Sequence, residues 1–170
     1  WGEYNTATRE AAFFYNVKML SDKQVILTDS LFYDTGKSMA HVTGPSRITS
    51  KGSIIKTENA YLNTKTDQSQ LFGRSTIIDK EKTIVGDSLF HNNDTGINEG
   101  FGNVIYIDTL NKNELRCNRL FYNEKTGYGY ATDSVLLKDF SRQPDTLYMH
   151  SDSLKLYTYN IDTDSVYRKV

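Results

Sequence analysis

Cysteine and alanine are scarce in this chain of 170 residues. Cys117 is the only cysteine, which excludes an internal disulfide framework and a cysteine-rich metal site. Only six alanines are present, against 12 tyrosines and 8 phenylalanines, and this balance disfavours a helical bundle. Abundant Thr, Tyr and Phe suit strands, while Asn, Asp and Gly suit turns. The composition and length predict one all-β domain over residues 1–170.

A surplus of positive charge and long apolar stretches are also missing. The formal net charge is −1 and the basic residues form no stripe, so we expect no nucleic-acid partner. No apolar stretch approaches the roughly 18–20 residues that a membrane-spanning helix needs. The sequence opens in mid-pattern at Trp1, and we interpret it as a mature or trimmed piece of a longer chain.

The sequence does contain an internal repeat, with a period of about 29 residues. The Asp-Ser-Leu-Phe-Tyr block at 29–33 returns as Asp-Ser-Leu-Phe-His at 87–91, which is two periods later, and weaker copies follow. Gly44, Gly73 and Gly102 keep the same spacing. The additional residues of the later copies fall in one connection of the unit, as is typical of loops on a repeating scaffold.

Each copy predicts two β-strands joined by tight turns. Apolar residues alternate along the first strand, and turn residues such as Asp-Thr-Gly follow it. The step of five from Ile26 to Leu31 changes the side on which apolar residues lie, which predicts a bulge near Thr28 and Asp29. About five copies would stack into a long antiparallel sheet that curls on itself, and aromatic residues would occupy both of its faces. The second apolar face either lines an open groove or is covered by another layer.

This arrangement resembles the OstA-like family, which comprises LptA, LptC and the N-terminal domain of LptD in lipopolysaccharide transport. The likeness lies in the blocks at 29–33, 87–91, 118–122 and 152–156, in the Thr-Gly turns, and in the second-strand pattern at 102–106. The abundance of Tyr, Asn and Asp looks like the Bacteroidetes branch of the family. The resemblance implies an elongated, twisted β-jellyroll of stacked repeats with a partly open apolar groove for the acyl chains of lipid A.

The resemblance further implies a non-enzymatic periplasmic protein that binds or bridges lipopolysaccharide on its way to the outer membrane. Expected partners are lipopolysaccharide or lipid A, and other Lpt-type jellyrolls or further copies of this chain stacked edge to edge; no cofactor is expected. Carried over by place in the repeat, the candidate groove residues are Ile26, Leu31, Tyr33, Ile48, Ile55, Leu62, Ile77, Ile84, Leu89, Tyr106, Leu115, Leu120, Tyr122 and Leu137. Each of them also suits an ordinary core, because cores and pockets share composition. His91 and Ala60 depart from the expected lining.

Two other functions fit the same pattern. A structural module could assemble end to end through its sheet edges without lipid cargo, because open edges invite pairing with another chain. A carbohydrate-binding or carbohydrate-active solenoid would require exposed aromatic platforms with paired carboxylates, and no such pair is evident in the sequence.

Catalytic and metal signals are weak. Two Asp-Thr-Gly triplets, at 34–36 and 94–96, match an aspartic-protease pattern, but they occupy equivalent turns with a repeat between them. Their carboxylates would lie roughly 10 Å apart at strand spacing, too far apart to share a proton. A recurring acidic position, at Asp29, Glu58, Asp87 and Asp152 with Asn118 in one copy, suits a bulge or strand edge better than a calcium site, which needs converging oxygens. The three histidines (His41, His91 and His150) share no ligand spacing, so we expect surface or lining residues and no metal.

Overall fold

The fold is one open antiparallel sheet of twelve strands in chain order. The computed structural model describes residues 1–142, 144–161 and 165–169. The strands are β1 (Gly2–Asn5), β2 (Glu10–Leu20), β3 (Gln24–Asp34), β4 (Met39–Ser50), β5 (Ser53–Asn63), β6 (Gln68–Asp79), β7 (Lys82–Asn92), β8 (Ile97–Asp108), β9 (Asn113–Asn123), β10 (Tyr128–Asp139), β11 (Leu147–Ile161) and β12 (Ser165–Lys169). In the described part of the chain, no helix is long and apolar enough to cross a membrane. The all-β prediction is confirmed.

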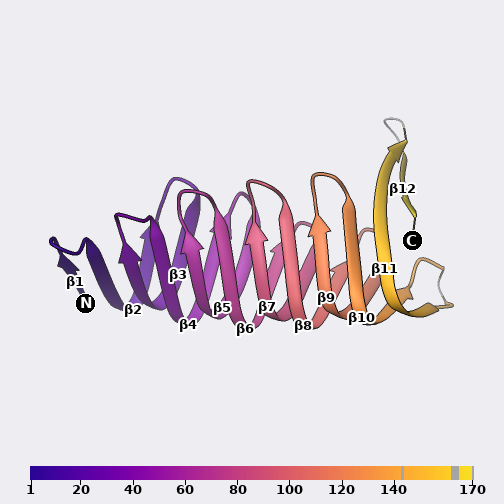
Figure 1. Ribbon diagram of the computed structural model, residues 1–170, viewed down its shortest axis with the longest axis horizontal. Coiled ribbons are helices and arrows are strands. Elements are labelled where there is room, and N and C mark those ends of the chain that lie inside the picture. Colours follow the sequence, from indigo (N-terminus) through magenta and orange to yellow (C-terminus); the bar gives the residue numbers. More distant parts are fainter. Residues whose placement is uncertain (143, 162–164, 170) are drawn as a thin grey trace.

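The strands stand side by side along the long axis of the molecule, with β1 at one end and β11 and β12 at the other (Figure 1). They curve strongly, so the sheet forms two walls that face each other instead of one flat layer. β3, β5 and β7 begin at Gln24, Ser53 and Lys82, each one sequence period after the last.

A β-bulge near the middle of the strands produces this curvature. Every strand pair from β2–β3 to β10–β11 has a register shift at that level, such as the one between Leu27 and Ser30 on β3. Ile26 is buried before the shift and Leu31 after it, although the step between them is odd-numbered. The shift turns both halves of the strand toward the same interior. The predicted bulge near Thr28 and Asp29 is confirmed.

Three rows of cross-strand neighbours line the interior. The isoleucine row, on one wall, is Ile26, Ile48, Ile55, Ile77, Ile84, Tyr106, Leu115 and Leu137. The leucine row, beyond the bulges, is Leu31, Val42, Ala60, Leu71, Leu89, Gly100, Leu120, Ala131 and Leu154. The mixed row, next to it, is Tyr33, Ala40, Leu62, Ser69, His91, Asn98, Tyr122, Gly129 and Leu156. Most of the apolar members of all three rows join one continuous core cluster.

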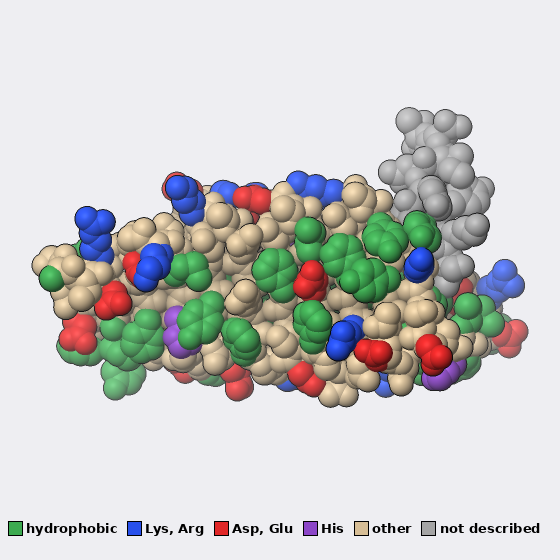
Figure 2. Space-filling model, viewed as in Figure 1, with side chains coloured by type: hydrophobic (Ala, Val, Ile, Leu, Met, Phe, Trp, Pro, Cys, Tyr) green, Lys and Arg blue, Asp and Glu red, His purple; other side chains and the backbone are tan. Residues whose placement is uncertain are grey.

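The outer surface carries a second set of aromatic residues. Ring contacts run from Phe14 through Phe32, His41 and Tyr61 to Phe72, and His41 and Tyr61 stack with centroids 4.2 Å apart. Figure 2 shows hydrophobic side chains distributed along the visible face. Because His41 and Tyr61 cover each other's faces, this contact is a cross-strand pair that stabilises the sheet rather than a flat platform for a sugar.

Two glycines at the bulges have similar backbone angles but different surroundings. Gly73 and Gly102 both have left-handed φ angles, of 79° and 72°. A Cβ atom on Gly73 would meet no described atom within 4 Å, whereas one on Gly102 would lie 2.9 Å from Oδ2 of Asp87. The same substitution therefore tests two different constraints.

We predict that Gly73→Ala lowers the free energy of unfolding by about 1–2 kcal/mol, which is the cost of placing a side chain in the left-handed region. Gly102→Ala should cost more, because the Asp87 carboxylate must also move. Urea denaturation of the two variants measures both losses. Equal losses would contradict the Asp87 contact, and no loss in either variant would contradict the bulge geometry.

Candidate functional site

All fourteen candidate groove residues face the interior. Eight make up the whole isoleucine row; Leu31, Leu89 and Leu120 lie on the leucine row; and Tyr33, Leu62 and Tyr122 lie on the mixed row. Thirteen of them are buried, with exposed fractions of 0–6%, and Tyr33 packs against the same cluster while partly buried. These side chains pack on one another, so they stabilise the fold whatever else they contact.

The candidate set left out several interior residues, among them Ala40, Val42, Leu71 and Ala131, which are fully buried in the leucine and mixed rows. Sequence analysis placed Ala60 at the repeat position of Leu31 and Leu89, and Ala60 is also fully buried. The signal that could have found Val42 and Leu71 is the period itself, because these two residues lie one period apart. In an interior row, a small residue leaves room for a larger neighbour on the facing wall.

The interior opens into a cavity near each end of the sheet. The N-end cavity, of about 340 Å³, is lined by Phe13, Val17, Lys18, Met19, Leu20, Leu31 and Tyr33. The C-end cavity, of about 300 Å³, is lined by Tyr106, Asn111, Asn113, Leu115, Leu137, Asp139, Ser141 and Leu156. Five of the candidate groove residues therefore border a cavity: Leu31, Tyr33, Tyr106, Leu115 and Leu137.

Polar side chains interrupt the mixed row near its middle. His91 is buried and its Nδ1 lies 2.7 Å from Oδ1 of Asn98. Because an amide oxygen only accepts hydrogen bonds, this contact assigns the proton to Nδ1 and leaves Nε2 as an acceptor. No described atom bonds Nε2. His91 thus lines the interior, which is one of the two positions expected for it.

Two edges of turns border the sheet. The lysine edge is formed by the connections at 21–23, 51–52, 80–81 and 109–112, each of which contains a lysine. The Asx edge is formed by the turns at 35–38, 64–67, 93–96 and 124–127, each of which follows an Asp or Asn. In one example, Oδ1 of Asn63 accepts hydrogen bonds from the backbone N–H groups of Lys65 and Thr66.

The two Asp-Thr-Gly triplets lie in equivalent turns of the Asx edge, as expected, but at different positions within those turns. Asp34 begins its turn, and its Oδ1 accepts from the backbone N–H groups of Gly36 and Lys37. In the later turn Asn92 takes this capping position, and its Oδ1 accepts from the N–H of Thr95. Asp94 lies two positions further on, where its carboxylate points to the opposite edge of the sheet.

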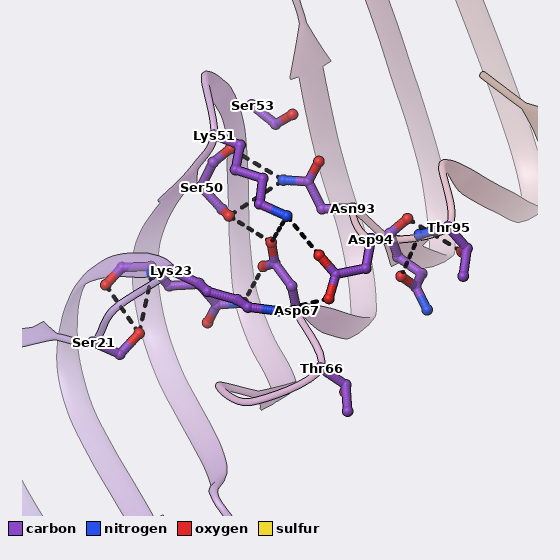
Figure 3. A network of polar contacts seen from close by, with 12 residues as sticks. Ser21, Lys23, Ser50, Lys51, Ser53, Thr66, Asp67, Asn93, Asp94 and Thr95 are labelled. Atoms are coloured by element: carbon purple, nitrogen blue, oxygen red, sulfur yellow. Dashed lines mark hydrogen bonds and ion pairs between the residues drawn. The ribbon is translucent and has the colours of Figure 1, made fainter. Parts of the chain in front are cut away.

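Polar side chains join the two edges over the interior, as Figure 3 shows. Lys23 Nζ donates to Oδ2 of Asp94 at 2.6 Å, and Lys51 Nζ donates to Oδ1 of the same carboxylate at 2.5 Å. Asp94 thus bridges two lysines from separate connections. We call this group of contacts the seam; its residues are Lys23, Gln24, Ser50, Lys51, Asp67, Asn93 and Asp94.

Asp67 is the buried half of the seam. Its Oδ1 accepts from Nε2 of Gln24 at 2.6 Å, and its Oδ2 accepts from Oγ of Ser50 at 2.8 Å. Only 3% of the Asp67 side chain is exposed, and Lys51 Nζ lies 3.9 Å from Oδ2. Both oxygens of a buried carboxylate are therefore satisfied by the opposite edge, and separating the edges would require water to replace these donors.

The two lysines change the acidity of Asp94. Hydrogen bonds from Lys23 and then from Lys51 lower the pKa of Asp94 to about 2, and Asp94 in turn raises the pKa of Lys51. About a third or more of each side chain is exposed, so water and salt screen these ion pairs. The seam is therefore held by several weak contacts.

Other chemical groups have structural roles. Asp87 Oδ2 accepts from Nδ2 of Asn103 beside the Gly102 bulge, and Oδ1 accepts from Arg74, as expected of a carboxylate that supports a bulge. No group of three or more His, Cys, Asp or Glu residues suited to a metal occurs among the described residues. Burial raises the pKa of the Cys117 thiol to about 11, which makes it a poor nucleophile.

A scan against protein-family models and a search of curated proteins both find no match for this chain. The features that bear on function are therefore the interior, its cavities and the seam.

The seam should weaken in acid. The folded-state pKa of Asp94 lies below the ordinary value of about 3.9, so its carboxylate stabilises the fold above about pH 4 and this contribution is lost as pH falls toward 2. The charged groups around it are Lys23 and Lys51, with Lys125 bonded to its backbone oxygen and Asp67 beyond Lys51.

We predict that Asp94→Asn is less stable than the unmodified protein near neutral pH and that the difference disappears toward pH 2. Thermal unfolding of both proteins across this pH range measures the stability difference. The effects of the other carboxylates on stability cancel in this difference, because both proteins contain them. A stability difference that does not change with pH would contradict the assigned ion pairs.

Proposed function

We propose that this protein is a non-enzymatic lipid carrier that holds acyl chains of an amphiphile such as lipid A in its interior. The observation that carries this proposal is the continuous apolar interior between the two walls, with a cavity near each end. Burial of each methylene group contributes about 0.8 kcal/mol, so acyl chains bind without any catalytic group.

The lining of the cavities supports an amphiphilic cargo. The C-end cavity has an apolar floor of Leu115, Leu137 and Leu156 and a rim that includes Asn113 and Asp139. The N-end cavity is almost wholly apolar, with Lys18 as its one charged lining residue. A chain in the interior would therefore have its polar end at a rim.

The finer architecture is part of the proposal. We infer a twisted OstA-like β-jellyroll of stacked hairpins, one hairpin per sequence period, acting in the periplasm in lipopolysaccharide transport. The strand starts at Gln24, Ser53 and Lys82 and the recurring bulges support the repeated unit. The family resemblance supports the pathway and the compartment.

End-to-end assembly is a second candidate function, and the sheet edges favour it. β1 pairs only with residues 10–13 of β2, so Tyr15 and Leu20 lie on a stretch of β2 whose outer side no described strand covers. Leu147 and Tyr148 are exposed at the start of β11 near the other end. A second copy, or another Lpt-type jellyroll, could continue the sheet head to tail and join the interiors.

Photo-crosslinking tests the lipid function. We predict that a benzophenone amino acid at Tyr33, which lines the N-end cavity, captures added lipopolysaccharide. The same group at Tyr130, which is exposed on the outer surface and lines neither end cavity, is the matched control and should capture far less. Equal capture at the two positions, or capture of protein alone at Tyr33, would refute the carrier function.

Sedimentation at increasing concentration tests assembly separately. We predict that Leu20→Lys abolishes any concentration-dependent oligomer, because a charge on the β2 edge opposes strand pairing. Oligomers that persist unchanged in Leu20→Lys would exclude this edge as the contact.

A further inference from the structure

The contacts that join the two edges across the interior are of a different type from those that join neighbouring strands. Neighbouring strands are joined by backbone ladders, and successive turns of one edge are joined by backbone hydrogen bonds, such as Thr64 N to Ser38 O and Asn93 N to Asp67 O. Among the described residues, no backbone–backbone hydrogen bond joins the lysine edge to the Asx edge. Side chains instead reach from one edge to the other, in the seam and in the bond from Lys82 Nζ to the Tyr122 hydroxyl at 2.7 Å.

We propose that the seam is a latch: the contacts of Asp67 and Asp94 with the opposite edge hold the two walls closed, and their release lets an acyl chain enter the interior from the side. The lateral entry rests on the proposed lipid function, whereas the opening of the walls does not.

Backbone hydrogen bonds connect successive turns along the Asx edge. The backbone bonds along the Asx edge connect the turns that carry Asp67 and Asp94, so these two carboxylates are linked to each other through the backbone. Their partners, Lys23, Gln24, Ser50 and Lys51, all belong to the first two connections of the lysine edge or lie beside them. Separation of the edges there breaks side-chain contacts and leaves every strand ladder intact.

One buried polar atom of the closed seam has no hydrogen-bond partner among the described residues. Gln24 is buried and donates through Nε2 to Asp67, yet its Oε1 has no hydrogen-bond partner among the described residues. A buried amide oxygen without a donor raises the free energy of the closed state relative to an open state in which water can reach it. The exposed ion pairs of Asp94 are also individually weak, so little free energy is needed to break these contacts of the seam.

The latch is connected to the N-end cavity. Tyr33 lines that cavity, and its hydroxyl lies 3.1 Å from Oγ1 of Thr64 in the turn that carries Asp67. Cargo that displaces Tyr33 would therefore disturb the turn that carries the buried carboxylate of the seam. This contact gives a physical route by which entry of a chain at one end favours opening of the side.

Distances between spin labels test the opening without any lipid. Labels on Asp22→Cys and Thr66→Cys, two exposed residues of opposite edges, report the separation of the walls, and buried Cys117 should remain unlabelled. We expect Asp94→Asn and Asp67→Asn to lengthen and broaden the distance distribution. Asp87→Asn, which breaks an exposed ion pair that does not cross the seam, is the matched control and should leave it unchanged. An unchanged distribution in both seam variants that remain folded would overturn the latch.

A reversible lock tests the lateral entry. In the same Asp22→Cys, Thr66→Cys protein, a cleavable bis-maleimide linker between the two introduced thiols holds the edges together, and pyrene-labelled palmitate serves as the probe. We expect the association rate of the probe to fall about tenfold or more in the locked protein and to recover after cleavage. Equal rates in the locked and cleaved forms would mean that chains enter through the ends, which overturns lateral entry. If the probe binds no form while the label distances still respond, the carrier function and lateral entry both fail and the latch remains.

Discussion

The register shift in the middle of the strands is the constraint on which the structure depends. In a regular strand, Ile26 and Leu31 would point to opposite faces because the step between them is odd-numbered. The shift brings both side chains to one interior, and its recurrence in every pair from β2–β3 to β10–β11 extends that interior along the molecule. Glycines such as Gly102 supply the left-handed backbone, and Asp87 fills the space beside it.

Different interactions stabilise the walls and join their edges. Backbone ladders and buried apolar rows hold each wall, and they are spread over many residues. A few polar side chains around Asp67 and Asp94 join the two edges above the apolar core that both walls share. Under the proposed carrier function, this division would let the walls keep their shape while the gap between the edges changes. The proposed latch would add access through the side to access through the ends.

The apolar repeat made much of this predictable. Strand composition indicated the all-β class, the step from Ile26 to Leu31 indicated the bulge, and repeat positions placed all fourteen candidates in the interior. The seam was not predictable, because it joins Lys23 to Asp94 across 71 residues and depends on how tightly the sheet curls. The repeat does not specify that curl. The Asp-Thr-Gly triplets correctly indicated equivalent turns, but they did not show that Asn92, rather than Asp94, caps the later turn.

Both halves of each strand face one shared interior, and methyl NMR can measure this arrangement. In protein labelled at isoleucine and leucine methyl groups, nuclear Overhauser effects report which side chains lie in contact. We predict cross-peaks between isoleucines of the isoleucine row, such as Ile55, and leucines of the leucine row, such as Leu71 or Leu89. Connectivities confined to each row, with none between the two rows, would mean that the rows face apart and that no shared interior exists.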